Sequence, residues 1–189
     1  MKRIFSLLLI LALLLALAAC GGTAEGATEI TISAVLAEQI DESGLCDDHE
    51  GQRNTNGTVT YTLSESQRRA LLRDLKAEAD RIAADMLEGE AQIEAFERIH
   101  YNDHMNKVDI AVSLDHYTEE AHAHASDFYM VCICYQVFSG MSSEEIFVEV
   151  NFRDPVTRLI HHRAPYTGEL GEFEANKVGG SAHQSETES

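Results

Sequence analysis

The residues with the most evident chemistry in this chain of 189 residues are its nine histidines, which are potential metal ligands. His100 and His104 have the four-residue spacing that places two ligands on one face of a helix. The residues between them, however, are typical of a hairpin turn. A dense acidic cluster at residues 47–50 does not have the spacing of a calcium-binding loop. We therefore expect no metal or other cofactor, with a metal site at His100 and His104 as the alternative.

Nucleophilic and hydrolytic chemistry has no recognisable signature in the sequence. The chain contains no Gly-x-Ser-x-Gly elbow, no His-Glu-x-x-His motif, no glycine-rich phosphate loop and no Ser-x-x-Lys motif. Most of its carboxylates fall on predicted solvated helix faces or loops, where no shielded pocket would perturb their pKa values. We therefore expect no catalytic residues and no enzymatic activity.

Cys20 ends an N-terminal segment that is typical of secretion. Lys2 and Arg3 precede an apolar run over residues 4–19, which at about 16 residues is shorter than the ~20 needed to span a bilayer. The sequence Leu-Ala-Ala-Cys at residues 17–20 resembles the lipobox of bacterial lipoproteins. This resemblance implies cleavage before Cys20, acylation of its thiol and attachment to the outer face of the cell membrane. Residues 1–19 would then be the signal peptide, and residues 20–28 a flexible tether.

Three further cysteines, Cys46, Cys132 and Cys134, lie in the remaining chain. An odd number outside the cytoplasm is consistent with one disulfide and a free thiol, or with no disulfide. If residues 118–139 are helical, Cys132 continues the inner face of that helix and Cys134 its outer face. Only one of them can face the loop that carries Cys46. Of the possible pairings we favour a disulfide between Cys46 and Cys134, with Cys132 as a buried thiol.

The formal net charge of −18 limits the class of partner. A strongly acidic surface repels nucleic acid and anionic lipid headgroups, so we expect no nucleic-acid partner. It could attract cations or basic partners, although such a charge also simply promotes solubility.

The first half of the chain predicts two strands followed by a helix. Alternating apolar residues over residues 29–36 and β-branched residues over 58–63 are typical of strands, and the polar segment between them reads as a loop. Ser64 and Gln67 form a capping box, and an apolar stripe continues from there to Gly89.

The second half of the chain predicts a hairpin, a second helix and another hairpin. The first hairpin covers residues 94–117, and its second arm alternates most clearly. Residues 118–139 favour a helix, although the apolar run over residues 128–138 could also be a buried strand. The last hairpin joins residues 146–152 to 157–162 through Asp154-Pro155, and residues 174–189 have too little to bury to fold.

This order of elements predicts an α+β fold. Two helices would pack on a mostly antiparallel sheet of about six strands, forming a single domain over residues 29–173 with a disordered tail over 174–189. With an anchor, one compact domain and no catalytic motif, we expect a lipid-anchored extracytoplasmic lipoprotein. We expect it to be a non-catalytic domain that binds a protein, a peptide or an envelope component. A metal-binding lipoprotein that uses histidines and the acidic loop is the alternative function.

Overall fold

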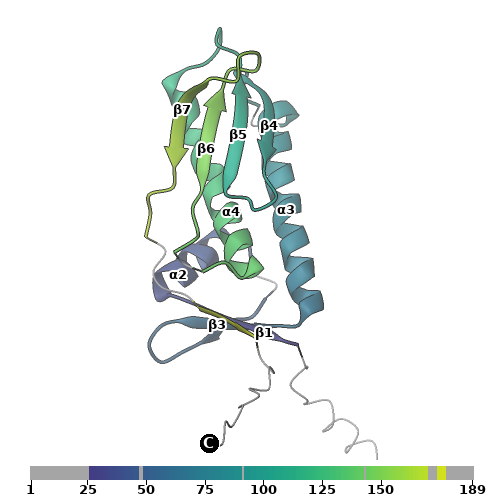
Figure 1. The fold of residues 1–189 in the computed structure, drawn as a ribbon, viewed down its shortest axis with the longest axis vertical. Helices are drawn as coiled ribbons and strands as arrows, with labels where there is room; N and C mark the ends of the chain where they lie inside the picture. The colour runs from purple at the N-terminus through teal and green to yellow at the C-terminus, as the bar shows by residue number, and fades with distance from the viewer. Residues whose placement is uncertain (1–25, 47–48, 91, 143, 170–173, 178–189) are drawn as a thin grey trace, which may run out of the picture.

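The computed structural model describes residues 26–46, 49–90, 92–142, 144–169 and 174–177 (Figure 1). The expected signal peptide, Cys20 and most of the expected tether lie outside these residues, so the anchor stays a prediction. None of the helices within the described ranges is both long enough and apolar enough to cross a membrane.

The first sheet contains both ends of the described chain. Its strands are β1 (Thr28–Ile32), β2 (Gln52–Arg53), β3 (Val59–Leu63) and β8 (Glu174–Lys177), in the antiparallel order β2-β3-β1-β8. Helix α2 (Ala34–Ser43) follows β1 directly. In Figure 1 this sheet forms the lower end of the molecule.

The second sheet forms the upper part of the molecule. Its strands are β4 (Phe96–Tyr101), β5 (Lys107–Val112), β6 (Glu149–Arg153) and β7 (Ile160–Pro165), in the order β4-β5-β6-β7. The two hairpin pairs are antiparallel, whereas β5 and β6 are parallel. A parallel pair requires a crossover connection. This crossover consists of the 3₁₀ helix η1 (Glu119–Ala125) and helix α4 (Ser126–Ser139).

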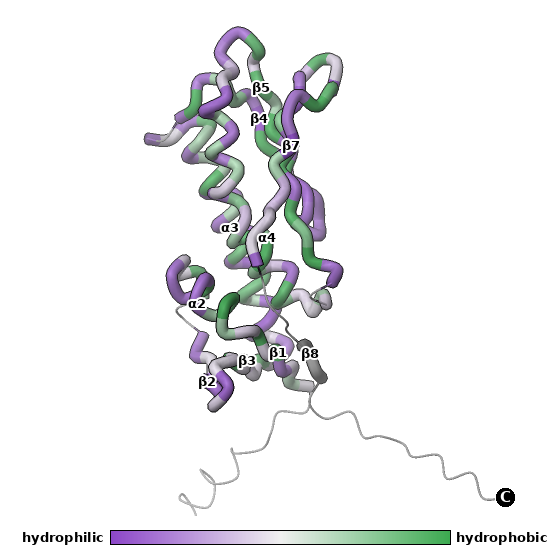
Figure 2. Tube along the Cα trace, turned by 90° about the vertical axis from the view of Figure 1, so that its left-hand side faces the viewer, coloured by the Kyte–Doolittle hydropathy of each residue, from purple (hydrophilic) through white to green (hydrophobic). Residues whose placement is uncertain are grey.

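Helices α3 (Glu65–Glu88) and α4 pack against each other and cover one face of the second sheet (Figures 1 and 2). The strand residues that point toward these helices are apolar and buried: Val108, Ile110, Val112, Val150 and Phe152. Among the described residues, no helix or second sheet covers the opposite face.

Several sequence predictions are confirmed. The α+β class is correct, and strands form within both of the first two expected segments, as β1 and β3. Ser64 and Gln67 form the expected capping box, and α3 ends at Gly89. The apolar run over residues 128–138 is helical and not a buried strand. It belongs to α4, which is buried on nearly every side.

The predicted single sheet with two helices is wrong. The described residues form two sheets and three α-helices, because β1 and β3 pair with each other and not with the later hairpins. The second predicted helix begins with a 3₁₀ segment at Glu119. The expected disordered tail does not begin at residue 174, because Glu174–Lys177 form strand β8, which pairs with β1. Residues 178–189, the rest of the expected tail, lie outside the described range.

Helix α2 is the α-helix that the sequence prediction missed. The expected strand over residues 29–36 ends at Ile32, and the Ser33 side chain caps a helix by accepting a hydrogen bond from the Leu36 amide at 3.1 Å. Gly44 ends this helix in the left-handed conformation, with a φ of 67°. Both residues are standard helix-boundary signals in a segment that otherwise reads as polar loop.

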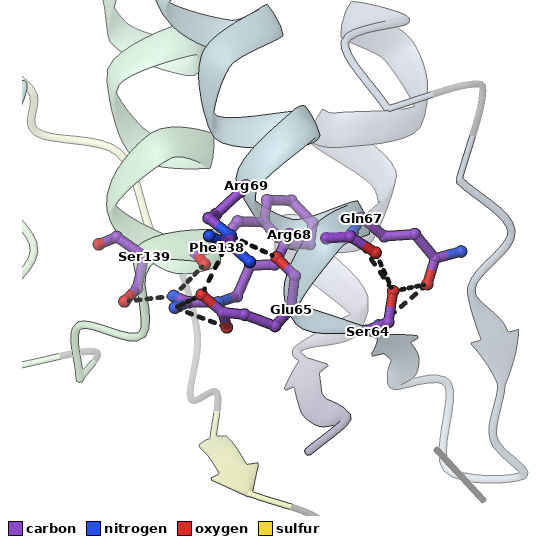
Figure 3. Close-up of polar contacts among 8 residues, drawn as sticks. Ser64, Glu65, Gln67, Arg68, Arg69, Phe138 and Ser139 are labelled. Atoms are coloured by element: carbon purple, nitrogen blue, oxygen red, sulfur yellow. Dashed lines mark hydrogen bonds and ion pairs between the residues drawn. The ribbon is translucent and has the colours of Figure 1, made fainter. Parts of the chain in front are cut away.

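Arg68 joins the beginning of α3 to the end of α4 (Figure 3). Its guanidinium Nη1 donates to the carbonyl oxygens of Ser139 at 3.1 Å and Phe138 at 3.4 Å, and its Nη2 lies 3.2 Å from Glu65. A cation at a helix C-terminus interacts favourably with the helix dipole and with unpaired carbonyl groups. Arg68 therefore fixes the contact between the two helices that cover the second sheet.

We expect Arg68→Met to lower the free energy of unfolding by about 1–2 kcal/mol, because the last carbonyl groups of α4 lose a charged donor. The matched control is Arg69→Met. The Arg69 side chain is 72% exposed, against 23% for Arg68, and donates to no residue of α4 among the described contacts. It should change stability by less than ~0.5 kcal/mol. Urea denaturation followed by circular dichroism measures both, and equal losses would contradict the role of Arg68.

Candidate functional site

The uncovered face of the second sheet carries a cleft of about 550 Å³, which we call the arginine cleft. Strands β4, β5 and β6 and the loop from β6 to β7 form it. Its lining residues are Arg98, Ile99, His100, Asp109, Ala111, Arg153, Asp154, Pro155 and Arg158.

Strand alternation explains why polar side chains gather on this face. Successive side chains of a strand point to opposite faces of the sheet. In β5 and β6, Ile110 and Phe152 are fully buried, so their neighbours Asp109 and Arg153 point to the open face. The strand register places Ala111 between Arg98 of β4 and Arg153 of β6. The same register places His100 opposite Asp109.

Asp109 is the acidic centre of the cleft floor. One of its carboxylate oxygens accepts a hydrogen bond from Arg153 Nε at 2.6 Å and another from the Asn151 side-chain amide at 3.1 Å. The Asn151 side chain is buried, and its own carbonyl oxygen has no hydrogen-bond partner among the described atoms. These bonds hold Arg153 by its Nε, so the outer nitrogens of its guanidinium group remain available for a ligand.

Arg98 and Arg158 have no carboxylate partner within the described part of the chain, unlike the arginines of α3. There, Arg68, Arg69, Arg73 and Arg81 all form ion pairs with acidic residues on the same helix. The cleft thus combines three guanidinium groups with only two carboxylates, Asp109 and Asp154, in a chain whose net charge is −18.

The loop between β6 and β7 holds Arg158 in an ordered but unusual conformation. Arg158 has a φ of 60°, in the left-handed region that non-glycine residues seldom adopt. The Arg158 amide donates to the Asp154 carbonyl oxygen at 3.0 Å, and the Asp154 amide donates to the Leu159 carbonyl oxygen at 3.0 Å. A residue in this sparsely populated conformation is stable only when its surroundings hold it there, and these two backbone hydrogen bonds do so for Arg158.

The Asp154 side chain stabilises the same loop. Its Oδ1 accepts hydrogen bonds from the backbone amides of Thr157 and Val156, and the bond from Thr157 is the main cause that lowers the pKa of this carboxyl. The Asp154 carboxylate therefore remains ionised, and its negative charge interacts with the amide groups of the loop itself.

The tip of this loop exposes two aliphatic side chains. Val156 is 87% exposed and Leu159 is 65% exposed, and they flank Arg158 in the sequence. Arginine combined with exposed apolar side chains is typical of protein-binding surfaces, where charged acidic residues and lysine are depleted.

His100 and His104, the residues of the alternative metal site, do not belong to a larger cluster of metal ligands among the described residues. His100 lies on β4 in the arginine cleft, and His104 lies in the turn between β4 and β5. Within the described ranges, no group of three or more His, Cys, Asp or Glu side chains is arranged to hold a metal ion.

Two other histidines meet on the helix side of β7. The rings of His122, on η1, and His162, on β7, are stacked with centroids 3.6 Å apart, and His122 Nε2 lies 2.6 Å from the Tyr117 hydroxyl. Burial, followed by the neighbouring His162, lowers the pKa of His122, and Glu119 acts weakly in the opposite direction. Sequence patterns could not predict this pair, because its members lie 40 residues apart on different elements.

The cysteines lie away from the arginine cleft. Cys46, Cys132 and Cys134 are free and buried, and Cys46 lies close to Cys134, as the favoured pairing requires. A disulfide between them stays a proposal.

The chain matches no family model, no curated protein and no solved structure.

The lowered pKa of His122 predicts a loss of stability in acid. Unfolded His122 takes up a proton near pH 6.5, while the folded state takes it up only at lower pH, so the folded state loses stability as pH falls below about 6.5. We expect His122→Phe, which keeps an aromatic ring against His162, to weaken this pH dependence. Urea denaturation at a series of pH values from 7.5 to about 5 measures it.

The matched control is His104→Phe, in the exposed turn between β4 and β5. It should leave the slope of stability against pH as in the wild type. A His122→Phe slope equal to that of wild type would show that the stacked pair does not sense pH.

Proposed function

We propose that this protein is a lipid-anchored extracytoplasmic lipoprotein whose arginine cleft binds an acidic peptide segment of a partner protein. The observation that carries the proposal is that Arg98 and Arg158 lie beside Arg153 on the open sheet face and have no carboxylate partner among the residues the structure describes. The domain acts by binding and not by catalysis.

Charge complementarity supports an acidic ligand. An arginine guanidinium group binds a carboxylate through two parallel hydrogen bonds, and the unpaired arginines leave these donors free. The net charge of −18 opposes an anion at long range, but salt screens such repulsion beyond about 8 Å at physiological ionic strength. The local charge in the cleft therefore decides the affinity.

The exposed loop tip favours a peptide over a simple anion. Val156 and Leu159 offer apolar surface beside Arg158, and a peptide that carries both acidic and apolar side chains could use both features. A polyanion without apolar groups would leave these aliphatic side chains exposed.

The position of the cleft suits a tethered receptor. Residues 26 and 27 belong to the last part of the expected tether and lead into β1 of the first sheet. Helix α3 has 24 residues and is therefore about 36 Å long, and it runs from that sheet to the opposite end, where β4 begins (Figure 1). The loop from β6 to β7 lies at this far end, because β6 ends at the edge where β4 begins. An anchor at Cys20 would thus leave the loop directed away from the membrane.

The cleft proposal predicts selective and salt-sensitive peptide binding. From a random peptide library, the wild-type protein should select peptides that contain Asp or Glu together with aliphatic residues. Arg98→Gln combined with Arg158→Gln should weaken their Kd about tenfold or more, because each removes a charged donor. Fluorescence anisotropy at two salt concentrations measures the affinity.

The control for this experiment is Arg69→Gln combined with Arg73→Gln, which makes the same change in net charge on the exposed face of α3. Its affinity should stay within about twofold of wild type. Selected peptides without acidic enrichment, or equal losses in the two double variants, would refute binding in the arginine cleft.

The anchor is tested by Cys20→Ser. Serine has no thiol to acylate, so we expect the protein to move from the membrane pellet to the soluble fraction and to stop incorporating labelled palmitate. Immunoblotting of fractionated cells measures the distribution. Cys46→Ser, which leaves the lipobox intact, should stay in the membrane pellet. Retention of Cys20→Ser in the membrane would overturn the lipoprotein assignment without affecting the cleft.

A further inference from the structure

Two buried thiols from distant parts of the chain meet beneath the first sheet. Cys46 follows helix α2, and Cys134 lies in the middle of α4. Cys46 lines a small cleft together with Tyr61 of β3, and Cys134 lies one helical turn before Phe138, whose ring packs against Tyr61 with centroids 5.3 Å apart. Both cysteines belong to the same hydrophobic core, and the neighbouring Cys46 raises the pKa of the Cys134 thiol. The two thiols therefore face the same part of the core.

Only one of the two thiols is accessible from outside. Cys46 is 5% exposed and lines a second cleft of about 230 Å³, together with Asp41, His49, Arg53 and Tyr61. Cys134 is fully buried. A reagent that enters this cleft would meet Cys46 first and Cys134 behind it.

Cys132 is unsuited to the same chemistry, although it lies two residues before Cys134. Two residues correspond to about 200° around a helix, so Cys132 points away from Cys46. It is fully buried and lines neither the arginine cleft nor the cleft beside Cys46. Neither a reagent in these clefts nor the Cys46 thiol therefore reaches Cys132.

We propose that Cys46 and Cys134 are a redox pair that an external disulfide oxidises, so that the resulting bond ties the segment after α2 to α4. This inference goes beyond the proposed binding function and does not depend on it. The structure describes the reduced state of the pair, with all three cysteines free.

The reaction is a double thiol–disulfide exchange. The Cys46 thiolate attacks an external disulfide R–S–S–R, forming a mixed disulfide and releasing one RS⁻. Cys134 then loses its proton and attacks the Cys46 sulfur, which expels the second RS⁻. Two protein thiols are oxidised to one disulfide, and the reagent is reduced to two thiols that take up the two protons.

The direct test uses the full-length protein in detergent, treated with glutathione disulfide. The sample is denatured in the presence of a maleimide, and labelling at each cysteine is read by peptide mass spectrometry. We expect Cys132 to be labelled and Cys46 and Cys134 to appear as one linked peptide pair, which dithiothreitol separates. Cys132→Ser should form the same linkage.

Labelling of Cys46 and Cys134 in the oxidised wild type would overturn the proposal, as would a linkage that includes Cys132. Reading each cysteine separately keeps the result independent of the state of Cys20. Because the wild type alone gives this answer, the test does not depend on whether Cys46→Ser or Cys134→Ser folds.

The proposed bond also predicts a redox-dependent stability. A bond between Cys46 and Cys134 closes a long loop of the unfolded chain, which stabilises the folded state. We expect the oxidised protein to melt about 5–15 °C above the reduced protein, in the wild type and in Cys132→Ser alike. Equal melting temperatures of linked and reduced protein would contradict the role of the bond in tying the two segments together.

Discussion

The whole arrangement depends on the burial of helix α4. This helix is apolar around nearly its entire circumference, so it is stable only where other elements surround it. Helix α3 and the second sheet pack along it, and Phe138 at its end packs edge-on against Tyr61 of the first sheet with ring centroids 5.3 Å apart. Its one buried polar side chain, Gln136, donates to the carbonyl oxygens of Met105 and Phe147. These bonds link α4 to the turn between β4 and β5 and to the segment before β6.

The burial of α4 also determines which face of the second sheet can bind a ligand. Both long helices occupy one face, so the side chains that alternate with the core residues of β5 and β6 lie on the opposite face. On this open face the parallel pairing of β5 and β6 brings Asp109 and Arg153 into contact. The arginine cleft is therefore a consequence of the crossover through α4.

Local sequence signals predicted the local structure well. The capping box at Ser64 and the strict alternation in β5 gave the correct elements, because both depend on neighbouring residues alone. Helix α2 was missed although Ser33 and Gly44 mark its ends, since the apolar alternation of β1 was extended past Ile32. The division into two sheets and the arginine cleft could not be predicted. They depend on strand order, which joins residues as distant as Arg98 and Arg153.

The central claim is that the cleft arginines, and not the acidic surface as a whole, recognise a ligand. Nuclear magnetic resonance of the isotope-labelled protein, titrated with a peptide of alternating glutamate and leucine at low salt, tests it most directly. We expect the guanidinium signals of Arg98, Arg153 and Arg158 to shift at the lowest peptide concentrations. The amide signals of Val156 and Leu159 should saturate together with them. Shifts spread equally over the arginines of α3, or no saturable shift in the cleft, would contradict it.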